Sequence, residues 1–174
     1  TGVQTCALPI WVNFAFAQGM RTIVRHDPDV ILVGEIRDRE TAEVAIQSAL
    51  TGHLVFSTLH TNDAAGAFTR LLDMGIEEYL AASTVRGVLA QRLVRRLCPA
   101  CCERRPITAT EGKRLALPAG QVADAGSGCP QCNNIGYKGQ IGLFELLQTT
   151  PEIERLVMAR ANSSRLREQA VREG

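Results

Sequence analysis

The 174-residue chain is poor in three features that would point to particular functions. No apolar run approaches the roughly 20 residues that a membrane-spanning helix needs, so we expect any membrane contact of these residues to be peripheral. The formal net charge is only +1, whereas proteins that bind nucleic acid usually carry a strongly basic face. Aromatic residues make up 5% of the chain, which is too few for a surface on which bases stack. We therefore expect no nucleic acid partner.

A phosphate-binding loop is also missing. No segment fits the pattern Gly-x-x-x-x-Gly-Lys-Ser/Thr, in which backbone N–H groups cradle the phosphates of a nucleotide. Because that cradle supplies most of the contacts to the phosphates, residues 11–174 alone are expected not to hydrolyse ATP. The composition, 45% hydrophobic and 21% charged, is otherwise that of one globular domain, or of one domain with a small appendix.

An uninterrupted aliphatic segment, Val30–Val33, predicts a strand that is buried on both faces of a parallel sheet. Gly34 and Glu35 follow it directly, at the strand end where ligands bind in open α/β sheets. A carboxylate at this edge can hold Mg²⁺, directly or through water, and such cations accompany nucleotide phosphates. Glu35 is therefore a candidate site residue, with a solvated loop residue as the alternative.

A second apolar strand is expected just after His53, and it is followed by Ser57, Thr58 and His60. If this strand runs parallel to the first, its polar end lies in the same crevice as Glu35. A neutral imidazole there can donate a hydrogen bond to a terminal phosphate oxygen and so report that the phosphate is present. The alternative is that these histidines are ordinary packed or surface residues.

Segment 24–38 reads Val-Arg-His-Asp-Pro-Asp-Val-Ile-Leu-Val-Gly-Glu-Ile-Arg-Asp. It resembles the signature of the secretion and type IV pilus ATPases, whose Walker B strand ends in Gly-Glu and continues as Ile-Arg-Asp. Segment 51–64 is similar to the histidine box of that family. The resemblance implies catalytic roles for Glu35, which would position Mg²⁺ through water, and for His60, which would sense the γ-phosphate. The nucleotide and Mg²⁺ site would also include Gly34, His53 and Thr58.

The same resemblance implies an α/β fold, with part of a RecA-like ATPase core, and ATP and Mg²⁺ as cofactors. It further implies a homo-hexamer on the cytoplasmic face of the inner membrane, which would work with platform and linker proteins of a secretion or pilus machine. An arginine-rich stretch, 86–105, is a candidate for contact with acidic phospholipids or with the nucleotide of a neighbouring subunit, with a solvated face that carries subunit-contact residues as the alternative. Type II secretion and type IV pilus assembly remain alternatives.

Two Cys-x-x-Cys pairs form the second motif. In a chain without a visible secretion signal, such pairs indicate metal binding in a reducing compartment. Each pair supplies two thiolates from a tight turn, and together they complete a closed tetrahedral Zn²⁺ site with a structural role, formed by Cys98, Cys101, Cys129 and Cys132. Cys102 either competes with Cys101 or remains a free thiol. The alternatives are unlinked buried thiols and, for the whole chain, a non-catalytic zinc-stabilised interaction module.

The motifs divide the chain into four predicted segments. The first ten residues resemble translated sequencing-adapter sequence, with a genuine but divergent strand as the alternative. The segments are a foreign leader at 1–11, the C-terminal part of a RecA-like domain at 12–97, a zinc module at 98–135, and a return strand with C-terminal helices at 136–174.

Local signals predict further elements. Asp38 is a suitable N-cap for a helix at 39–51, and Thr150-Pro151 predicts the start of another. Apolar residues at helical spacing predict a helix over 79–93. Between the cysteine pairs the pattern is weak, so we expect only a short helix at 110–117 and expect the metal to supply the remaining order.

Overall fold

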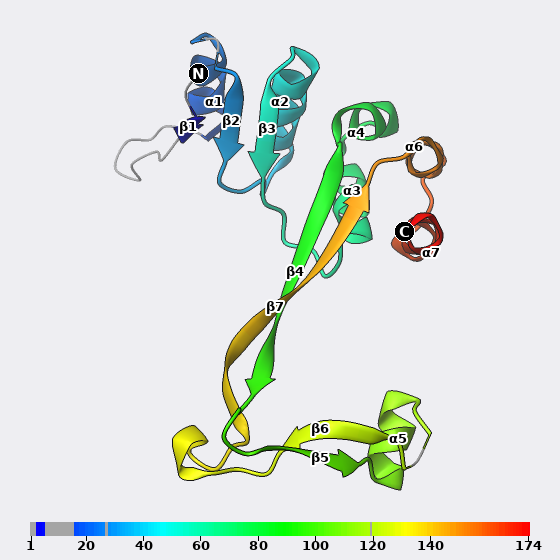
Figure 1. The fold of residues 1–174 in the computed structure, drawn as a ribbon. Coiled ribbons are helices and arrows are strands. Elements are labelled where there is room, and N and C mark those ends of the chain that lie inside the picture. The colour runs from blue at the N-terminus through cyan, green and yellow to red at the C-terminus, as the bar shows by residue number, and fades with distance from the viewer. Residues whose placement is uncertain (1–2, 6–15, 27, 119) are drawn as a thin grey trace. The chain divides into compact units, whose positions relative to one another are not determined.

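The structure is a computed structural model that describes residues 3–5, 16–26, 28–118 and 120–174 (Figure 1). It comprises two compact units, which we describe separately. Unit 1 contains Thr1–Ala90 and Glu145–Gly174, and unit 2 contains Gln91–Phe144. Within the described residues, no helix combines the length and the apolar character needed to cross a lipid bilayer.

Unit 1 is built on a parallel sheet of three strands, β1 (Val3–Thr5), β2 (Val30–Val33) and β3 (Leu54–Ser57), in the order β1-β2-β3. The predicted strand at 30–33 is confirmed. In the register of β2 and β3, Val30 lies opposite Leu54 and Val33 opposite Ser57. Strand β1 falls within the segment that was expected to be foreign, and it pairs in parallel with β2.

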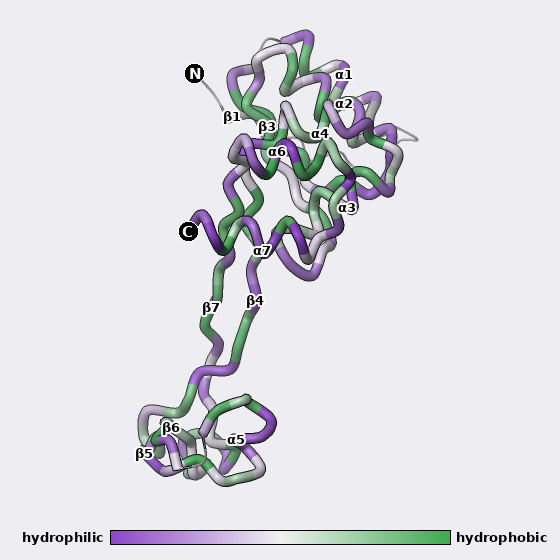
Figure 2. Tube along the Cα trace, turned by 90° about the vertical axis from the view of Figure 1, so that its right-hand side faces the viewer, coloured by the Kyte–Doolittle hydropathy of each residue, from purple (hydrophilic) through white to green (hydrophobic). Residues whose placement is uncertain are grey.

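Helices α1 (Phe16–Val24) and α2 (Arg39–Leu50) cover one face of this sheet (Figure 1 and Figure 2). Ile31 and Val33 point toward that covered face and are buried, whereas Leu32 on the other face is exposed. Asp38 caps α2 as predicted, because its carboxylate accepts a 2.8 Å hydrogen bond from the backbone N–H of Thr41. This cap fixes the start of α2 immediately after the loop that carries Glu35 in the sequence.

The described residues of unit 1 form four more helices: α3 (Ala65–Asp73), α4 (Glu78–Thr84), α6 (Pro151–Met158) and α7 (Ser163–Glu173). The predicted start of α6 is confirmed, since the Thr150 hydroxyl accepts a hydrogen bond from the N–H of Ile153 and Pro151 occupies the first turn. The side chains of Phe68, Ile153 and Leu166 join α3, α6 and α7 to the core, and Ala81 and Ala82 join α4 to it.

The prediction of a helix over 79–93 is correct up to residue 84 and wrong from residue 87, where a strand begins. Helix α4 ends at Thr84, and the chain continues as the long strand β4 (Gly87–Leu97), which pairs with β7 (Tyr137–Gln148). A Cβ atom at Gly87 would lie 3.3 Å from the Leu147 carbonyl oxygen, so the glycine permits a close approach of the two strands. Pairing with a segment fifty residues away in sequence overrides the helical spacing of the apolar residues.

Unit 2 contains an antiparallel pair that the sequence did not reveal, β5 (Cys102–Pro106) with β6 (Val122–Gly126). Helix α5 (Ala109–Leu115) lies between them in sequence and begins with a capping box of Thr108 and Glu111. In the second cysteine pair, Cys129 is the N-cap of a short 3-10 helix, Pro130–Cys132, and Cys132 is its last residue.

Candidate functional site

The carboxyl ends of β2 and β3 meet at one edge of the sheet, because the two strands are parallel and their last paired residues are Val33 and Ser57. Backbone and side-chain hydrogen bonds join the segments that follow. The Ile36 N–H donates to the Thr58 carbonyl oxygen at 3.0 Å, and the Thr58 hydroxyl donates to the Gly34 carbonyl oxygen at 2.7 Å. The loop carrying Glu35 is therefore held against the segment that leads to His60.

Glu35 and His60, predicted from separate segments, are brought together. His60 Nε2 lies 2.5 Å from Glu35 Oε1, while Arg37 Nε donates to the other carboxylate oxygen, Oε2, at 2.7 Å. The Glu35 side chain is only 21% exposed, whereas those of His60 and Arg37 are 88% and 76% exposed. Oε1 is buried and, apart from this contact with the imidazole, has no hydrogen-bond partner among the described residues.

His53 lies at the other end of β3. Its Nδ1 faces the Ser48 carbonyl oxygen at 3.0 Å and the Thr51 hydroxyl at 3.1 Å, next to the last turn of α2. A four-residue strand spans about 13 Å, so the structure does not bring His53 to the edge that holds Glu35. The sequence already contained a signal for this separation, because His53 comes before the strand and His60 comes after it.

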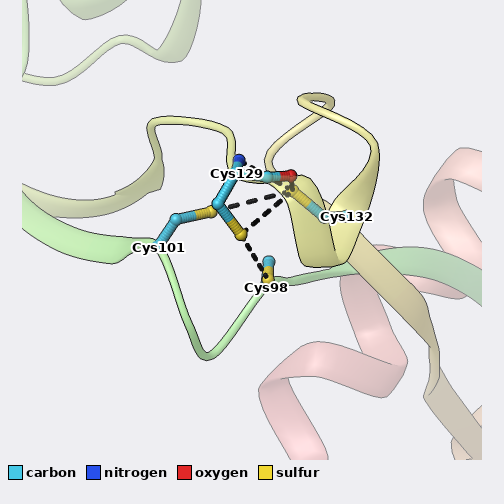
Figure 3. A group of neighbouring side chains, drawn as sticks. All are labelled: Cys98, Cys101, Cys129 and Cys132. Atoms are coloured by element: carbon cyan, nitrogen blue, oxygen red, sulfur yellow. Dashed lines mark hydrogen bonds between the residues drawn. The ribbon is translucent and has the colours of Figure 1, made fainter.

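The four cysteines predicted as metal ligands form one cluster in unit 2 (Figure 3). Their sulfur atoms all lie within 4.8 Å of one another. Three pairs are separated by 3.8 to 3.9 Å, namely Cys98 with Cys129, Cys101 with Cys132 and Cys129 with Cys132. In a tetrahedral site with Zn–S bonds of about 2.3 Å, the sulfurs stand about 3.8 Å apart. The donor set and its spacing therefore fit Zn²⁺.

The pKa values of two cysteines in the cluster are shifted in opposite directions. Burial raises the pKa of Cys132, but hydrogen bonds from the N–H groups of Cys129 and Gly136, both 3.3 Å from its sulfur, and from the thiols of Cys101 and Cys129 together lower it to about 6. Burial and the neighbouring thiols raise the pKa of Cys101 to about 12, against a lowering bond from the backbone of Gly128. Full deprotonation of such a cage requires a bound cation.

Cys102, considered as a competing ligand, lies outside this cluster. Cys102 is exposed. Among the described residues, the cluster whose side chains could hold one metal ion consists of the other four cysteines and does not include Cys102. Arg37 is the residue that the sequence reasoning missed, since nothing in the sequence pattern indicated which way its side chain turns.

Fold and site together define an α/β protein with an acid and a histidine at the carboxyl edge of a parallel sheet, and with a separate tetracysteine cluster. The chain belongs to the type II/IV secretion system protein family, whose family model matches residues 2–174. The resemblance drawn from the sequence is thereby confirmed.

Named relatives agree with this assignment. The chain is 51% identical over 154 residues to "Type II secretion system ATPase E" of Vibrio cholerae, a match covering 86% of this chain and 30% of that protein. It is 46% identical over 169 residues to "Type IV pilus assembly ATPase TfpB" of Acinetobacter baylyi, covering 94% and 28%. The solved structure of the pilus retraction motor PilT with bound ADP is 30% identical, with a TM-score of 0.57, and the match covers 84% of this chain and 33% of that one. The chain thus spans about 30% of the length of these curated relatives.

Proposed function

We propose that these residues belong to a hexameric motor ATPase that couples MgATP hydrolysis to type II protein secretion. The observation that carries the proposal is the contact between Glu35 and His60, two side chains that reach one sheet edge from different strands. The relative from Vibrio cholerae, named a type II secretion ATPase, supports the reaction. Assembly of a type IV pilus is the second candidate, favoured by the similarity to the Acinetobacter protein.

In this proposal Glu35 holds Mg²⁺ through water. The residues fit the ion, since Mg²⁺ prefers oxygen ligands and Oε1 of Glu35 is a buried oxygen that has no hydrogen-bond partner among the described residues apart from its contact with His60. When bound, Mg²⁺ would neutralise charge on the transferring phosphoryl group. His60 Nε2 would donate to the terminal phosphate oxygen, and the Thr58 hydroxyl keeps the Gly34 carbonyl in place beside it.

We assign His53 a structural role instead of its predicted role in nucleotide binding, because it packs at the end of α2, away from Glu35. The proposal retains a RecA-like core for the sheet of unit 1. The segment 98–135, which falls inside unit 2, is proposed as a structural zinc module. A place on the cytoplasmic face of the inner membrane, with platform proteins, linker proteins and acidic phospholipids as partners, also belongs to the proposal.

The test uses the full-length protein that contains these residues, with ATP turnover measured against Mg²⁺ concentration. Glu35→Gln and His60→Ala are each expected to lower the turnover rate by about 100-fold, a typical effect of losing one group that stabilises developing charge. His53→Gln is the matched control and should stay within about twofold of the original rate, because its side chain faces the Ser48 carbonyl. Purified residues 11–174 should show no Mg²⁺-dependent turnover. Equal losses in the two histidine variants would overturn the assignment of the site.

A further inference from the structure

The Arg37 guanidinium is paired with the Glu35 carboxylate, which is the group that would hold the metal ion in the proposed site. Its Nε donates to Glu35 Oε2 at 2.7 Å, while the other oxygen of that carboxylate faces His60. Both oxygens of Glu35 are thus in contact with a side chain that carries, or can carry, a positive charge. The Arg37 guanidinium has no other hydrogen bond or ion pair within the described part of the chain.

The two partners of this ion pair differ in their freedom to move. Glu35 is held by a loop that is tied to Thr58 and has a side chain only 21% exposed. The Arg37 side chain is 76% exposed, so it can swing into solvent without losing buried contacts. A partly buried carboxylate without a counter-ion is costly, and Arg37 removes that cost when no metal is present.

We propose that Arg37 competes with the divalent cation for Glu35. It neutralises the carboxylate in the empty site and must move away before a hydrated metal ion takes its place. The inference rests on the proposed function, because it assigns a competitor to the same metal site. Two cations beside one carboxylate repel each other, so the positive charge of Arg37 weakens metal binding.

The consequence is a gain of affinity when the charge is removed. Arg37→Gln keeps a polar side chain of similar reach but loses the charge, and we expect it to bind the metal about two- to fivefold more tightly, the range for an exposed ion pair. Arg37→Lys keeps the charge and should bind as the original protein does. The difference between Gln and Arg should shrink at 1 M salt, where the screening length falls to about 3 Å.

The experiment measures Mn²⁺ binding by electron paramagnetic resonance, with full-length protein and a saturating non-hydrolysable ATP analogue. The matched control is Arg39→Gln, which removes a charge two residues away. The Arg39 guanidinium is paired at 2.6 Å with Glu43 instead of Glu35, and its side chain is 63% exposed. This control should leave the Mn²⁺ dissociation constant unchanged.

Tighter binding in Arg37→Gln alone supports the competition. Unchanged or weaker binding in that variant overturns it, because the arginine would then either be irrelevant or be needed to orient Glu35 for the metal. If the original protein binds no Mn²⁺ beyond what the nucleotide holds in solution, the proposed function fails, and the inference with it.

Discussion

The Glu111 carboxylate accepts four hydrogen bonds at the start of α5. Two come from Thr108, from its N–H at 2.8 Å and its hydroxyl at 2.9 Å, and two from Arg105, from Nη1 at 2.9 Å and Nη2 at 2.6 Å. The Arg105 guanidinium, followed by the two Thr108 groups, holds the pKa of Glu111 well below its usual value of 4.5. A carboxyl group with a lowered pKa in the folded state stabilises that state above its ordinary pKa and loses this contribution as the pH falls.

We therefore predict that α5 loosens as the pH drops below about 4.5, the range in which an unfolded glutamate takes up its proton. Amide hydrogen exchange at 109–115, followed from pH 7 to pH 3 and corrected for intrinsic rates, measures the effect. Glu111→Gln should exchange faster at neutral pH and show a flatter pH profile. A carboxyl group that titrates near 4.5 in the folded protein would contradict the prediction.

The residues of the candidate site were predictable to the extent that they follow from strand direction. Glu35 and His60 each come after an apolar strand, and parallel pairing places the ends of both strands at one edge. His53 comes before its strand, so the same rule places it at the opposite edge. The turn of Arg37 toward Glu35 depends on a side-chain rotamer, which leaves no trace in the sequence pattern.

At the scale of elements, the strand β6 approaches the cysteine cluster closely at the backbone of Gly136. A Cβ atom at Gly126 would lie 2.1 Å from the Gly136 carbonyl oxygen, a separation that no side chain can occupy. That same carbonyl accepts a hydrogen bond from the Cys98 N–H at 3.0 Å, and the Gly136 N–H points at the Cys132 sulfur. Any displacement of Gly136 is thus transmitted to both cysteine pairs.

Gly126→Ala is accordingly expected to destabilise unit 2 by about 2 kcal/mol, the middle of the range for overpacking a fitted site, and to speed metal loss. Thermal unfolding and the rate of zinc release to a chromogenic chelator measure the two effects. Ala123→Ser, at an exposed position of the same strand, is the control and should change neither. Zinc release from Gly126→Ala at the original rate would show that β6 does not support the cluster.

Elements were predictable where local signals agree with the tertiary fold. The capping residues Asp38 and Thr150 fixed the starts of α2 and α6, because a side-chain cap satisfies backbone donors whatever surrounds it. The strands β4, β5 and β6 were missed because their pairing partners are distant in the sequence. In β5, Cys102–Pro106, the residues are mostly polar and lack the alternation that marks a half-buried strand.

At the scale of the whole molecule, the described residues of the two units differ in how many apolar side chains they bury. Unit 1 has an extended apolar core that includes Phe68, Ile31, Leu147 and Ile153. The buried apolar side chains described in unit 2 are Ile107 and two members of the cysteine cluster, Cys98 and Cys132. A unit with so little apolar burial needs another source of stability, and a bound metal supplies it in many small domains.

Removal of the metal should therefore unfold unit 2 and spare unit 1. With a chelator and a reductant present, we expect amide exchange to accelerate by at least about 100-fold in β5 and β6, because binding free energy of a structural zinc is folding free energy. Exchange in α2 and α6 should stay within about twofold, since their side chains pack in the separate core of unit 1. Cys102→Ser is the matched control, because this exposed thiol lies outside the cluster, and it should bind one zinc as the original protein does. If the amides of β5 and β6 stayed fully protected from exchange without metal, hydrogen bonds alone would order unit 2. That result would contradict a structural role for the four cysteines.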